Sequence, residues 1–197
     1  MPADQRDFQE VMALDKAIIV EWNGEETILH SVASLYQMVW NDWNESHISR
    51  IKRHTGYKGF RGVTVVKDGE LIGYAYGYSS LSGQYYHELL ASHLAPDTST
   101  EWLNDCFEFV ELAVHPSCRK QGLGARLHDQ LLKKLPFKRA VLTTQTNNWP
   151  AISLYRSKGW SIISDSFLPY DDPEEPFIIF GKNLDITSHI HPADYTS

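Results

Sequence analysis

The sequence predicts a single α/β domain, and three observations lead to this prediction. A chain of 197 residues is long enough for one domain with a buried core. Segments with the two-residue period of strands alternate with segments whose apolar residues recur every three or four positions, as in helices. One apolar strand, residues 107–114, leads through a glycine-containing turn into an amphipathic helix, a unit that is typical of α/β proteins.

The N-terminal part predicts a strand followed by two helices. Weak alternation over residues 16–27 indicates the strand, with Asn23-Gly24 as a turn. Helical spacing then starts at Ser31, the predicted N-cap, and a second helix is predicted over residues 47–54. The aromatic residues near these helices are expected either in the core or in a ligand pocket; they are Trp40, Trp43 and Tyr57.

The next segment predicts an antiparallel hairpin. Residues 60–67 and 70–78 flank Asp68-Gly69, which is a strong turn signal. In the second strand, alternation places tyrosines on one face and small residues on the other. The small face is expected to allow close approach of a helix or a ligand; the two faces are Ile72, Tyr74, Tyr76 and Tyr78, and Leu71, Gly73, Ala75 and Gly77.

The second half of the chain continues the alternation of helices and strands. Residues 83–95 have helical spacing, and after a break at residues 96–100 a short helix ending at Trp102 is predicted, with Ser99 or Thr100 as its cap. The further predicted elements are a helix up to Leu135, strands over 139–144, 160–164 and 176–184, a helix over 148–158 that stops at Gly159, and an acidic loop over 171–175. Residues 1–15 and 186–197 are expected to be peripheral tails of the one domain, residues 1–197.

Composition narrows the class of protein. With 42% hydrophobic and 22% charged residues, no apolar run of membrane-spanning length and no signal peptide, the chain is expected to be globular and cytoplasmic. Its two cysteines, Cys106 and Cys118, predict neither a disulfide framework nor a zinc site. The net charge of −7 argues against nucleic acid as a partner. Residues 115–140, however, carry a charge of +6, which leaves −13 for the rest and predicts an anionic ligand at this place.

The turn between the central strand and its helix has the pattern of a phosphate-binding loop. Its glycines, Gly122 and Gly124, permit close approach of a ligand to backbone N–H groups at a helix N-terminus. No Lys-Ser/Thr pair follows them, which excludes a Walker loop, and Leu127 stands where a dinucleotide-binding loop has its third glycine. Arg119 lies three residues before Gly122, so the remaining pattern is R-x-x-G-x-G.

Two motifs together resemble the GCN5-related N-acetyltransferases, the GNAT superfamily. The family's R/Q-x-x-G-x-G/A motif matches at Arg119, Gly122 and Gly124. Its second motif, N-x-x-A-x-x-L-Y-x-x-x-G-F/W, follows about two dozen residues later and matches at Asn148, Ala151, Leu154, Tyr155, Gly159 and Trp160. The resemblance implies the GNAT fold: a mixed, mostly antiparallel sheet with helices on both faces, in which the strand of Glu111 splays from that of Val141.

The resemblance also implies acetyl-CoA as cofactor, with its pyrophosphate on the turn and its pantetheine along the central strand. The residues it assigns to the cofactor are Leu112, Ala113, Val114, Arg119, Lys120, Gln121, Gly122, Leu123, Gly124, Ala125 and Asn148. Asn148 can also cap its helix. The implied reaction is direct acetyl transfer to a primary amine of a small molecule or a lysine side chain, and the acidic remainder of the chain hints at a cationic acceptor.

Two catalytic residues are predicted. Tyr155 matches the family's general acid, and Glu111, in an apolar strand, is the candidate base, since burial would raise its pKa. Glu111 can equally be a structural carboxylate, with Glu108 or another residue as the base. A catalytically silent CoA-binding module is the rival function.

No metal is expected, because the spacing of His189 and His191 suggests no third ligand. A thiol nucleophile at Cys118 is not expected either, since His115, three residues before it in a proline-containing turn, need not meet it.

Overall fold

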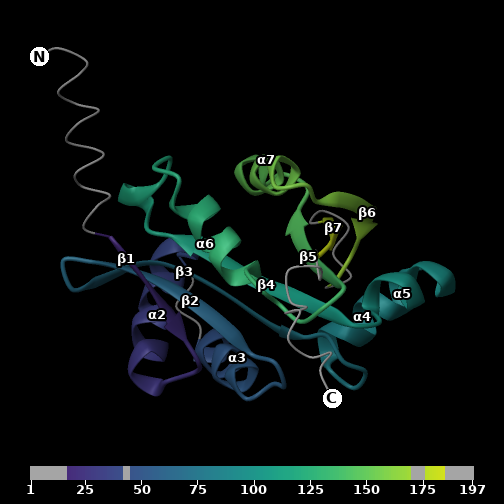
Figure 1. The fold of residues 1–197 in the computed structure, drawn as a ribbon, viewed down its shortest axis with the longest axis horizontal. Helices are drawn as coiled ribbons and strands as arrows, with labels where there is room; N and C mark the ends of the chain where they lie inside the picture. The colour runs from purple at the N-terminus through teal and green to yellow at the C-terminus, as the bar shows by residue number, and fades with distance from the viewer. Residues whose placement is uncertain (1–16, 42–44, 170–175, 185–197) are drawn as a thin grey trace, which may run out of the picture. The chain divides into compact units, whose positions relative to one another are not determined.

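A computed structural model gives the structure of residues 17–41, 45–169 and 176–184 (Figure 1). Both predicted tails, Trp43 and the acidic loop 171–175 lie outside these described residues, as do His189 and His191. Within the described part of the chain, no helix is both long and apolar enough to cross a membrane.

The described strands form one sheet with the order β1-β2-β3-β4-β5-β7-β6. Their bounds are β1 (Ile18–Trp22), β2 (Arg61–Lys67), β3 (Glu70–Ser79), β4 (Cys106–Val114), β5 (Arg139–Gln145), β6 (Ser161–Phe167) and β7 (Phe177–Asn183). The helices are α2 (Glu26–Trp40), α3 (Glu45–Thr55), α4 (Tyr85–His93), α5 (Pro96–Leu103), α6 (Leu123–Leu132) and α7 (Trp149–Ser157), with a short 3-10 turn, η1 (Pro116–Cys118). β4 pairs with β5 in parallel, while β1–β2, β2–β3, β5–β7 and β6–β7 are antiparallel. The predicted mixed, mostly antiparallel α/β sheet is confirmed.

The chain divides into two compact units, which are described one at a time. Unit 1 comprises the described residues up to Gly77 together with Glu111–Leu131. Unit 2 comprises Tyr78–Val110 and the described residues from Leu132 onwards. The organisation of residues 1–197 as one domain stays a prediction.

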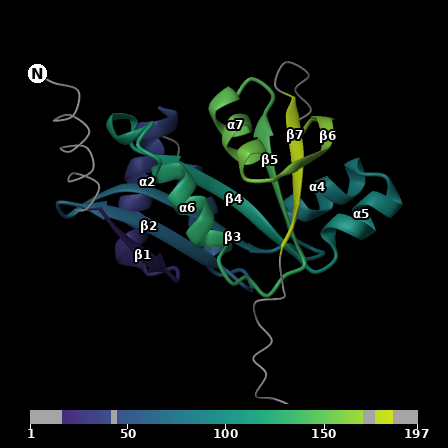
Figure 2. The same ribbon diagram turned by 45° about the horizontal axis from the view of Figure 1, so that its top comes forward.

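In unit 1, helices cover both faces of the strands (Figures 1 and 2). α2 and α3 lie on one face, where the side chain of Tyr76 meets His54 of α3. α6 lies on the other face, where a Cβ added at Gly73 would come within 3.1 Å of Leu127 Cδ1. The two faces of β3 therefore differ as its alternation predicted, and helix α6 packs on the face that carries the small residues.

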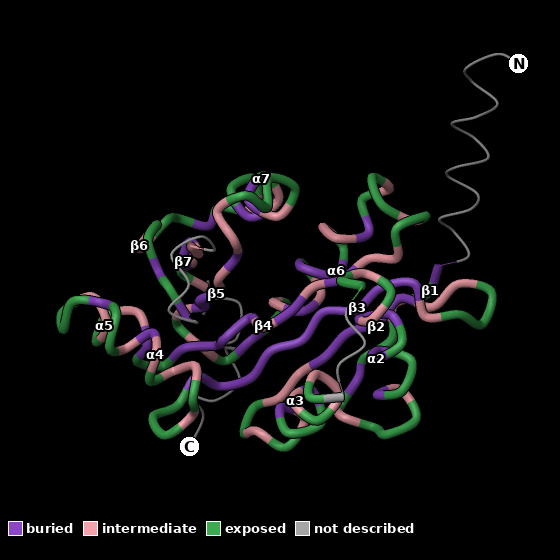
Figure 3. The backbone as a smooth tube through the Cα atoms, turned by 180° about the vertical axis from the view of Figure 1, so that it is seen from behind, coloured by how far each residue is buried: buried purple, intermediate pink, exposed green. Residues whose placement is uncertain are grey.

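In unit 2, the strands are also covered on both faces. Val141 and Ile179 belong to a core cluster that includes Leu90 of α4 and Leu103 of α5. The neighbouring residue Phe180 points to the opposite face and contacts Tyr155 of α7 at a ring-centroid distance of 6.1 Å. Figure 3 shows the result along the backbone, since buried positions concentrate on the strands and exposed positions on the outer sides of the helices.

The parallel pairing of β4 with β5 is short. It covers Cys106 with Arg139, Phe107 with Ala140 and Glu108 with Val141. The antiparallel pairing of β5 with β7, in contrast, runs through all seven residues of β5. The predicted splay of the strand of Glu111 from that of Val141 stays a prediction.

Three predicted helix bounds are wrong. α2 begins at Glu26 rather than after Ser31, because Gly24 (φ +95°) turns the chain out of β1 and the Glu25 carbonyl at once accepts hydrogen bonds from Ile28 and Leu29. α5 begins at Pro96, because proline fits the first position of a helix, so Ser99 and Thr100 lie inside it. α6 ends at Leu132 rather than at Leu135, and Lys134 beyond it has a φ of +58°.

Candidate active site

The predicted phosphate-binding turn leads directly into α6 in unit 1. The first hydrogen bond recorded for the helix runs from Arg126 N–H to the Gly122 carbonyl. The N–H groups of residues 122–125 precede it and therefore have no partner within the helix, which is the arrangement that binds an anion. Lys120 (φ +61°) and Gly122 (φ +75°) both have left-handed backbone conformations, which shape the approach to the helix.

The side chains around the turn add positive charge. Arg119, Lys120 and Arg126 are exposed. The Arg119 Nε–H donates to the Val114 carbonyl over 3.3 Å and so ties the turn to the end of β4. His115 accepts a hydrogen bond from Ser117 N–H and also contacts the Ser117 hydroxyl at 2.7 Å, which fixes η1 before the turn. Cys118 is half-buried and lies 3.6 Å from the same hydroxyl.

The end of β4 in unit 1 alternates in burial. Glu111 and Ala113 are buried, whereas Leu112 and Val114 are half-buried. The N–H of His115, which follows the strand, donates to the Ile72 carbonyl of β3 over 2.8 Å. Residues 112–114 and the turn 119–125 therefore belong to one continuous strand–turn–helix segment of unit 1.

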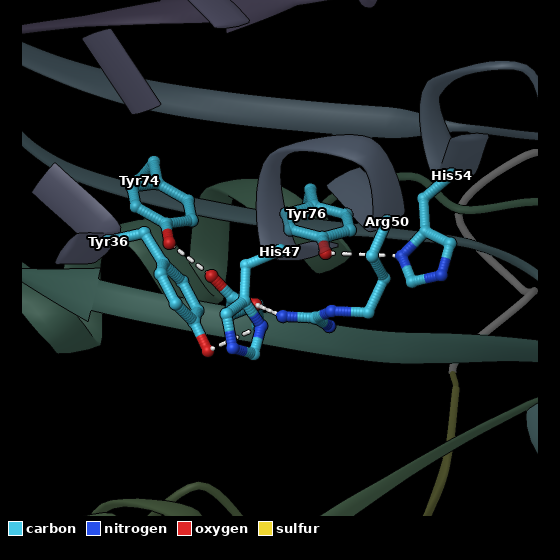
Figure 4. Close-up of polar contacts among 7 residues, drawn as sticks. Tyr36, His47, Arg50, His54, Tyr74 and Tyr76 are labelled. Atoms are coloured by element: carbon cyan, nitrogen blue, oxygen red, sulfur yellow. Dashed lines mark hydrogen bonds and ion pairs between the residues drawn. The ribbon is translucent and has the colours of Figure 1, made fainter. Parts of the chain in front are cut away.

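Glu111 lies in a polar network with Arg50 and Tyr74, two side chains that Figure 4 labels. Its Oε1 accepts a hydrogen bond from the Tyr74 hydroxyl, and its Oε2 forms an ion pair with Arg50 Nη2 at 3.1 Å. Only 9% of Glu111 is exposed. Burial raises the pKa of Glu111 above its ordinary value, although Arg50 and Tyr74 oppose this by stabilising the carboxylate. Glu111 is thus buried and already paired with a cation.

Tyr36 packs against Arg50 and two further rings. The Arg50 guanidinium lies over the Tyr36 ring, 5.7 Å from its centroid, and the Tyr36 ring also stacks on Trp40 (centroids 4.6 Å apart) and contacts the His47 ring (4.8 Å). The Tyr36 hydroxyl lies 3.2 Å from His47 Nδ1. Beside them, the buried His54 contacts the Tyr76 hydroxyl at 3.2 Å, and burial together with Arg50 and Arg53 lowers the pKa of His54 to about 3.

Sequence reasoning did not identify Arg50, Tyr36 or His47. They come from helices α2 and α3 and stand 61 to 75 positions before Glu111 in the chain. The available signal was the tyrosine face of β3, because hydroxyl groups in a buried face require polar partners.

The predicted acid Tyr155 lies in unit 2. It is buried on α7, and its ring packs edge-on against Phe109 and Trp160, with centroids 6.0 Å away in each case. Burial raises the pKa of Tyr155 above its ordinary value, so the phenol keeps its proton through the neutral range. Asn148 is the N-cap of the same helix, as predicted, and its Oδ1 accepts from Ala151 N–H at 3.4 Å.

Glu108, the alternative base, is also in unit 2. It is 4% exposed, and its two carboxylate oxygens accept hydrogen bonds from Tyr78 Oη (2.9 Å) and Ser80 Oγ (3.4 Å). Burial raises the pKa of Glu108 to about 7, against the lowering by these two hydroxyls. Its recorded side-chain hydrogen bonds come from hydroxyl groups alone, in contrast to those of Glu111.

The predicted residues therefore fall into two sets. Unit 1 brings Glu111 together with residues 112–114 and 119–125 on one continuous segment, whereas Tyr155 and Asn148 lie on α7 of unit 2. Within the described residues, no three His, Cys, Asp or Glu side chains gather in a way that would hold a metal ion.

Comparison with known proteins gives a family and a set of structural neighbours. The Acetyltransferase (GNAT) family matches residues 25–160. Among curated proteins there is no match.

Solved structures with a similar fold include known and proposed acetyltransferases. The ribosomal-protein-S18-alanine N-acetyltransferase from Escherichia coli has a TM-score of 0.64 at 18% identity, over 92% of this chain and 99% of that one. Aminoglycoside 6'-acetyltransferase type Ii has a TM-score of 0.62 at 20% sequence identity, and the match covers 84% of this chain and 96% of that one. The yncA protein from Salmonella typhimurium was solved with its cofactor acetyl-CoA. It has a TM-score of 0.60 at 15% sequence identity, and the match covers 91% of this chain and 99% of that one. At these identities the likeness concerns the fold. Because the family match spans more than two thirds of the sequence and carries both motifs, the chain belongs to the GNAT family of acetyltransferases.

Proposed function

We propose that this protein transfers an acetyl group from acetyl-CoA to a primary amine by direct attack of the amine on the thioester. The observation that carries the proposal is the family match over residues 25–160, which spans β4, the turn and α7. Acetyl-CoA is the donor that the family uses, and it supplies an acetyl group already activated as a thioester. The compartment, predicted as the cytoplasm, stays a prediction.

The residues of the turn fit the phosphates of this donor. Four backbone N–H groups at the start of α6 have no helical partner, and a Cβ added at Gly122 would meet no atom within 4 Å, so a ligand has room to approach. Arg119, Lys120 and Arg126 supply charge for the third phosphate. We assign the pantetheine to residues 112–114, whose strand backbone can donate and accept hydrogen bonds along an extended ligand.

An amine must lose a proton to react, and two buried carboxylates are candidates to accept it. Glu111 is the base that the family resemblance predicts, but the ion pair with Arg50 favours its charged form and so weakens its affinity for a proton. Glu108 is the second candidate, because hydroxyl partners and a pKa of about 7 suit proton uptake near neutral pH. The carboxylate whose replacement by glutamine removes the acidic limb of the pH–rate profile is the base.

The leaving thiolate of CoA needs a proton, and we assign its delivery to Tyr155. An ordinary phenol is about as acidic as a thiol, so it can protonate a thiolate. The raised pKa keeps Tyr155 protonated through the neutral range, while it also makes the phenol a weaker acid. The variant Tyr155→Phe retains the ring that packs on Phe109 and Trp160 and lacks only the hydroxyl. A wild-type kcat in this variant would exclude the role.

The acceptor is proposed to be an amine of a small molecule or of a lysine side chain. The ring of Tyr36 is not assigned to its ammonium group, because this ring already contacts Arg50, Trp40 and His47. The acidic character of the sequence outside residues 115–140 supports a cationic acceptor.

The experiment that separates an enzyme from a silent CoA-binding module is thiol release. The protein is incubated with acetyl-CoA and, in turn, spermidine, kanamycin, a peptide with N-terminal alanine and a lysine amide with a blocked α-amine. We expect free CoA to appear with at least one of these amines at a rate well above hydrolysis. Tight CoA binding without thiol release on every amine would instead support the silent module.

The cofactor site is tested by Gly122→Glu. A carboxylate at this position would repel the phosphates, so we expect the Kd of acetyl-CoA to rise by more than about 100-fold, which corresponds to about 3 kcal/mol. Because Gly122 has a φ of +75°, any side chain strains the backbone, and Gly122→Ala is the matched control for that strain. Calorimetric titration in which both variants bind like the wild type would exclude the assigned site.

A further inference from the structure

Glu108 is one end of a chain of hydrogen-bonding groups in unit 2. Its carboxylate accepts from Ser80 Oγ at 3.4 Å, and the same Ser80 oxygen lies 3.0 Å from His87 Nδ1 on α4. Glu108 and Ser80 are buried, whereas His87 is half-buried. The three groups thus lead from the interior of unit 2 towards its surface.

The loop that carries Ser80 is held in place at several points. Ser80 N–H donates to the Cys106 carbonyl of β4 over 2.9 Å. Leu81 N–H donates to Gln84 Oε1 over 2.8 Å, and Glu88 accepts from both Ser82 and Gly83. Ser80 and His87 are therefore fixed relative to Glu108 by the fold of the β3–α4 connection.

We propose that Ser80 and His87 conduct to solvent the proton that Glu108 takes from the attacking amine. This inference rests on the proposed function and on Glu108, rather than Glu111, as its base. Ser80 and His87 act through Glu108 and are positioning residues in this scheme.

The chemistry of the three groups permits this transfer. Once Glu108 holds the amine's proton, the Ser80 hydroxyl turns from Glu108 to His87 Nδ1. The Glu108 proton then moves to Ser80 Oγ while the Ser80 proton moves to His87 Nδ1, and the imidazolium so formed releases the proton on its Nε2 to water. Ser80 again donates to Glu108 as at the start, and return of His87 to its first tautomer completes the cycle, so that one proton enters and one leaves in each turnover.

The groups around Glu108, Ser80 and His87 favour a role in proton transfer over a purely structural role. A structural buried carboxylate is ordinarily paired with a cation, as Glu111 is with Arg50, but both recorded partners of Glu108 are hydroxyls. The other titratable groups that face the chain are Tyr78 and Cys106 beside Glu108, and Glu88 beside His87. Burial lowers the pKa of His87, which keeps its ring neutral and able to accept a proton at neutral pH.

The test compares His87→Ala with His93→Ala, a matched control from the same helix whose side chain contacts Ser164 instead. Using the best amine of the four above at low buffer concentration, we expect His87→Ala to lower kcat by about tenfold, with recovery on adding imidazole. Ser80→Ala should lower kcat similarly without recovery, and Glu108→Gln should lower it by about 100-fold or more. The His93 variant should match the wild type.

Two results would overturn the relay. One is a Glu108→Gln variant with wild-type turnover, and the other is a His87→Ala variant that matches the His93 control at low buffer. A wild-type protein that releases no thiol would instead refute the proposed function. In that case the infrared carbonyl band of protonated Glu108, identified by its loss in Glu108→Gln, still tests the chain: its titration should shift in Ser80→Ala, and an unshifted titration would overturn the coupling.

Discussion

Glu108 and Glu111 are buried carboxylates on the same strand, yet their partners give them different properties. Glu111 is paired with Arg50, so its charge is compensated. Glu108 accepts hydrogen bonds from the Tyr78 and Ser80 hydroxyls, and its pKa of about 7 means that the folded protein binds a proton on this carboxyl more tightly than the unfolded chain does. Neutral glutamine should therefore be tolerated at position 108 and harmful at position 111, where it would leave Arg50 unpaired.

This difference predicts how Glu108→Gln changes stability with pH. The pKa of Glu108 is about 7 in the folded protein and near 4.5 in the unfolded chain, so folding binds a proton between these values. The wild type consequently loses about 3 kcal/mol of unfolding free energy from this group as pH rises from 4.5 to 7. Glu108→Gln has no such proton, so its free energy of unfolding relative to that of the wild type should rise by this amount between pH 4.5 and 7.

Urea unfolding at several pH values measures the effect. The stability difference between Glu108→Gln and wild type should grow between pH 4.5 and 7 and stay constant above pH 8. Glu111→Gln serves as the comparison, and it should be less stable than wild type at pH 7. A difference for Glu108→Gln that does not vary with pH would contradict the raised pKa.

At the scale of elements, local signals predicted strands and turns better than helix starts. The Asp68-Gly69 turn has a positive φ at both residues, as the favoured two-residue hairpin requires, and β2 and β3 lie where the sequence placed them. The start of α2 was missed because its cap position is Glu25, which makes no side-chain cap, so Ser31 was the better signal in the sequence. The start of α5 was missed because Pro96 was read as a breaker rather than as a first helical residue.

β1 and β2 meet at a contact that only glycine permits. Trp22 of β1 is fully buried and lies opposite Gly62 of β2. A Cβ at Gly62 would come within 2.6 Å of the indole and within 2.9 Å of the Trp22 carbonyl. The Trp22 ring must therefore lie directly across the backbone of β2.

We accordingly predict that Gly62→Ala destabilises the protein by about 1–3 kcal/mol through overpacking. Gly56→Ala is the matched control, because a Cβ there makes an ordinary 3.4 Å contact with the Arg53 carbonyl. Thermal unfolding followed by circular dichroism should give a lower Tm for the first variant and a nearly unchanged Tm for the second. Equal melting temperatures would show that Trp22 can move without cost.

At the scale of the whole chain, the distribution of charge bears on cofactor binding. Residues 115–140 carry +6 within a protein of net charge −7, and this segment contains the proposed phosphate site. Electrostatic attraction between exposed charges is screened by salt. We expect the Kd of acetyl-CoA to rise severalfold, by roughly tenfold at most, between 50 mM and 500 mM NaCl.

S-acetylpantetheine, which has no phosphates, is the matched ligand for this prediction. Its weaker binding should be nearly independent of salt, because residues 112–114 offer backbone and apolar contacts rather than charges. Equal salt dependence for the two ligands would assign the effect to something other than the phosphates.

The sequence also allowed the family to be predicted, because both motifs are local in the chain and each serves a backbone need, such as the open approach at Gly122 or the cap at Asn148. The Arg50–Glu111 ion pair could not be predicted in the same way. It joins two residues 61 positions apart, and nothing in the helical pattern of α3 distinguishes Arg50 from the neighbouring basic residues. Contacts of this kind depend on how helices pack on the sheet rather than on local sequence.

The β2–β3 turn has a practical consequence for handling the protein. Asp68 and Gly69 are exposed, and a Cβ added at Gly69 would meet no atom within 4 Å. Exposed tips of this kind accept inserted peptides and chemical anchors. The turn is therefore the place to attach an affinity tag or a surface linker, which would leave the residues proposed for acetyl transfer untouched.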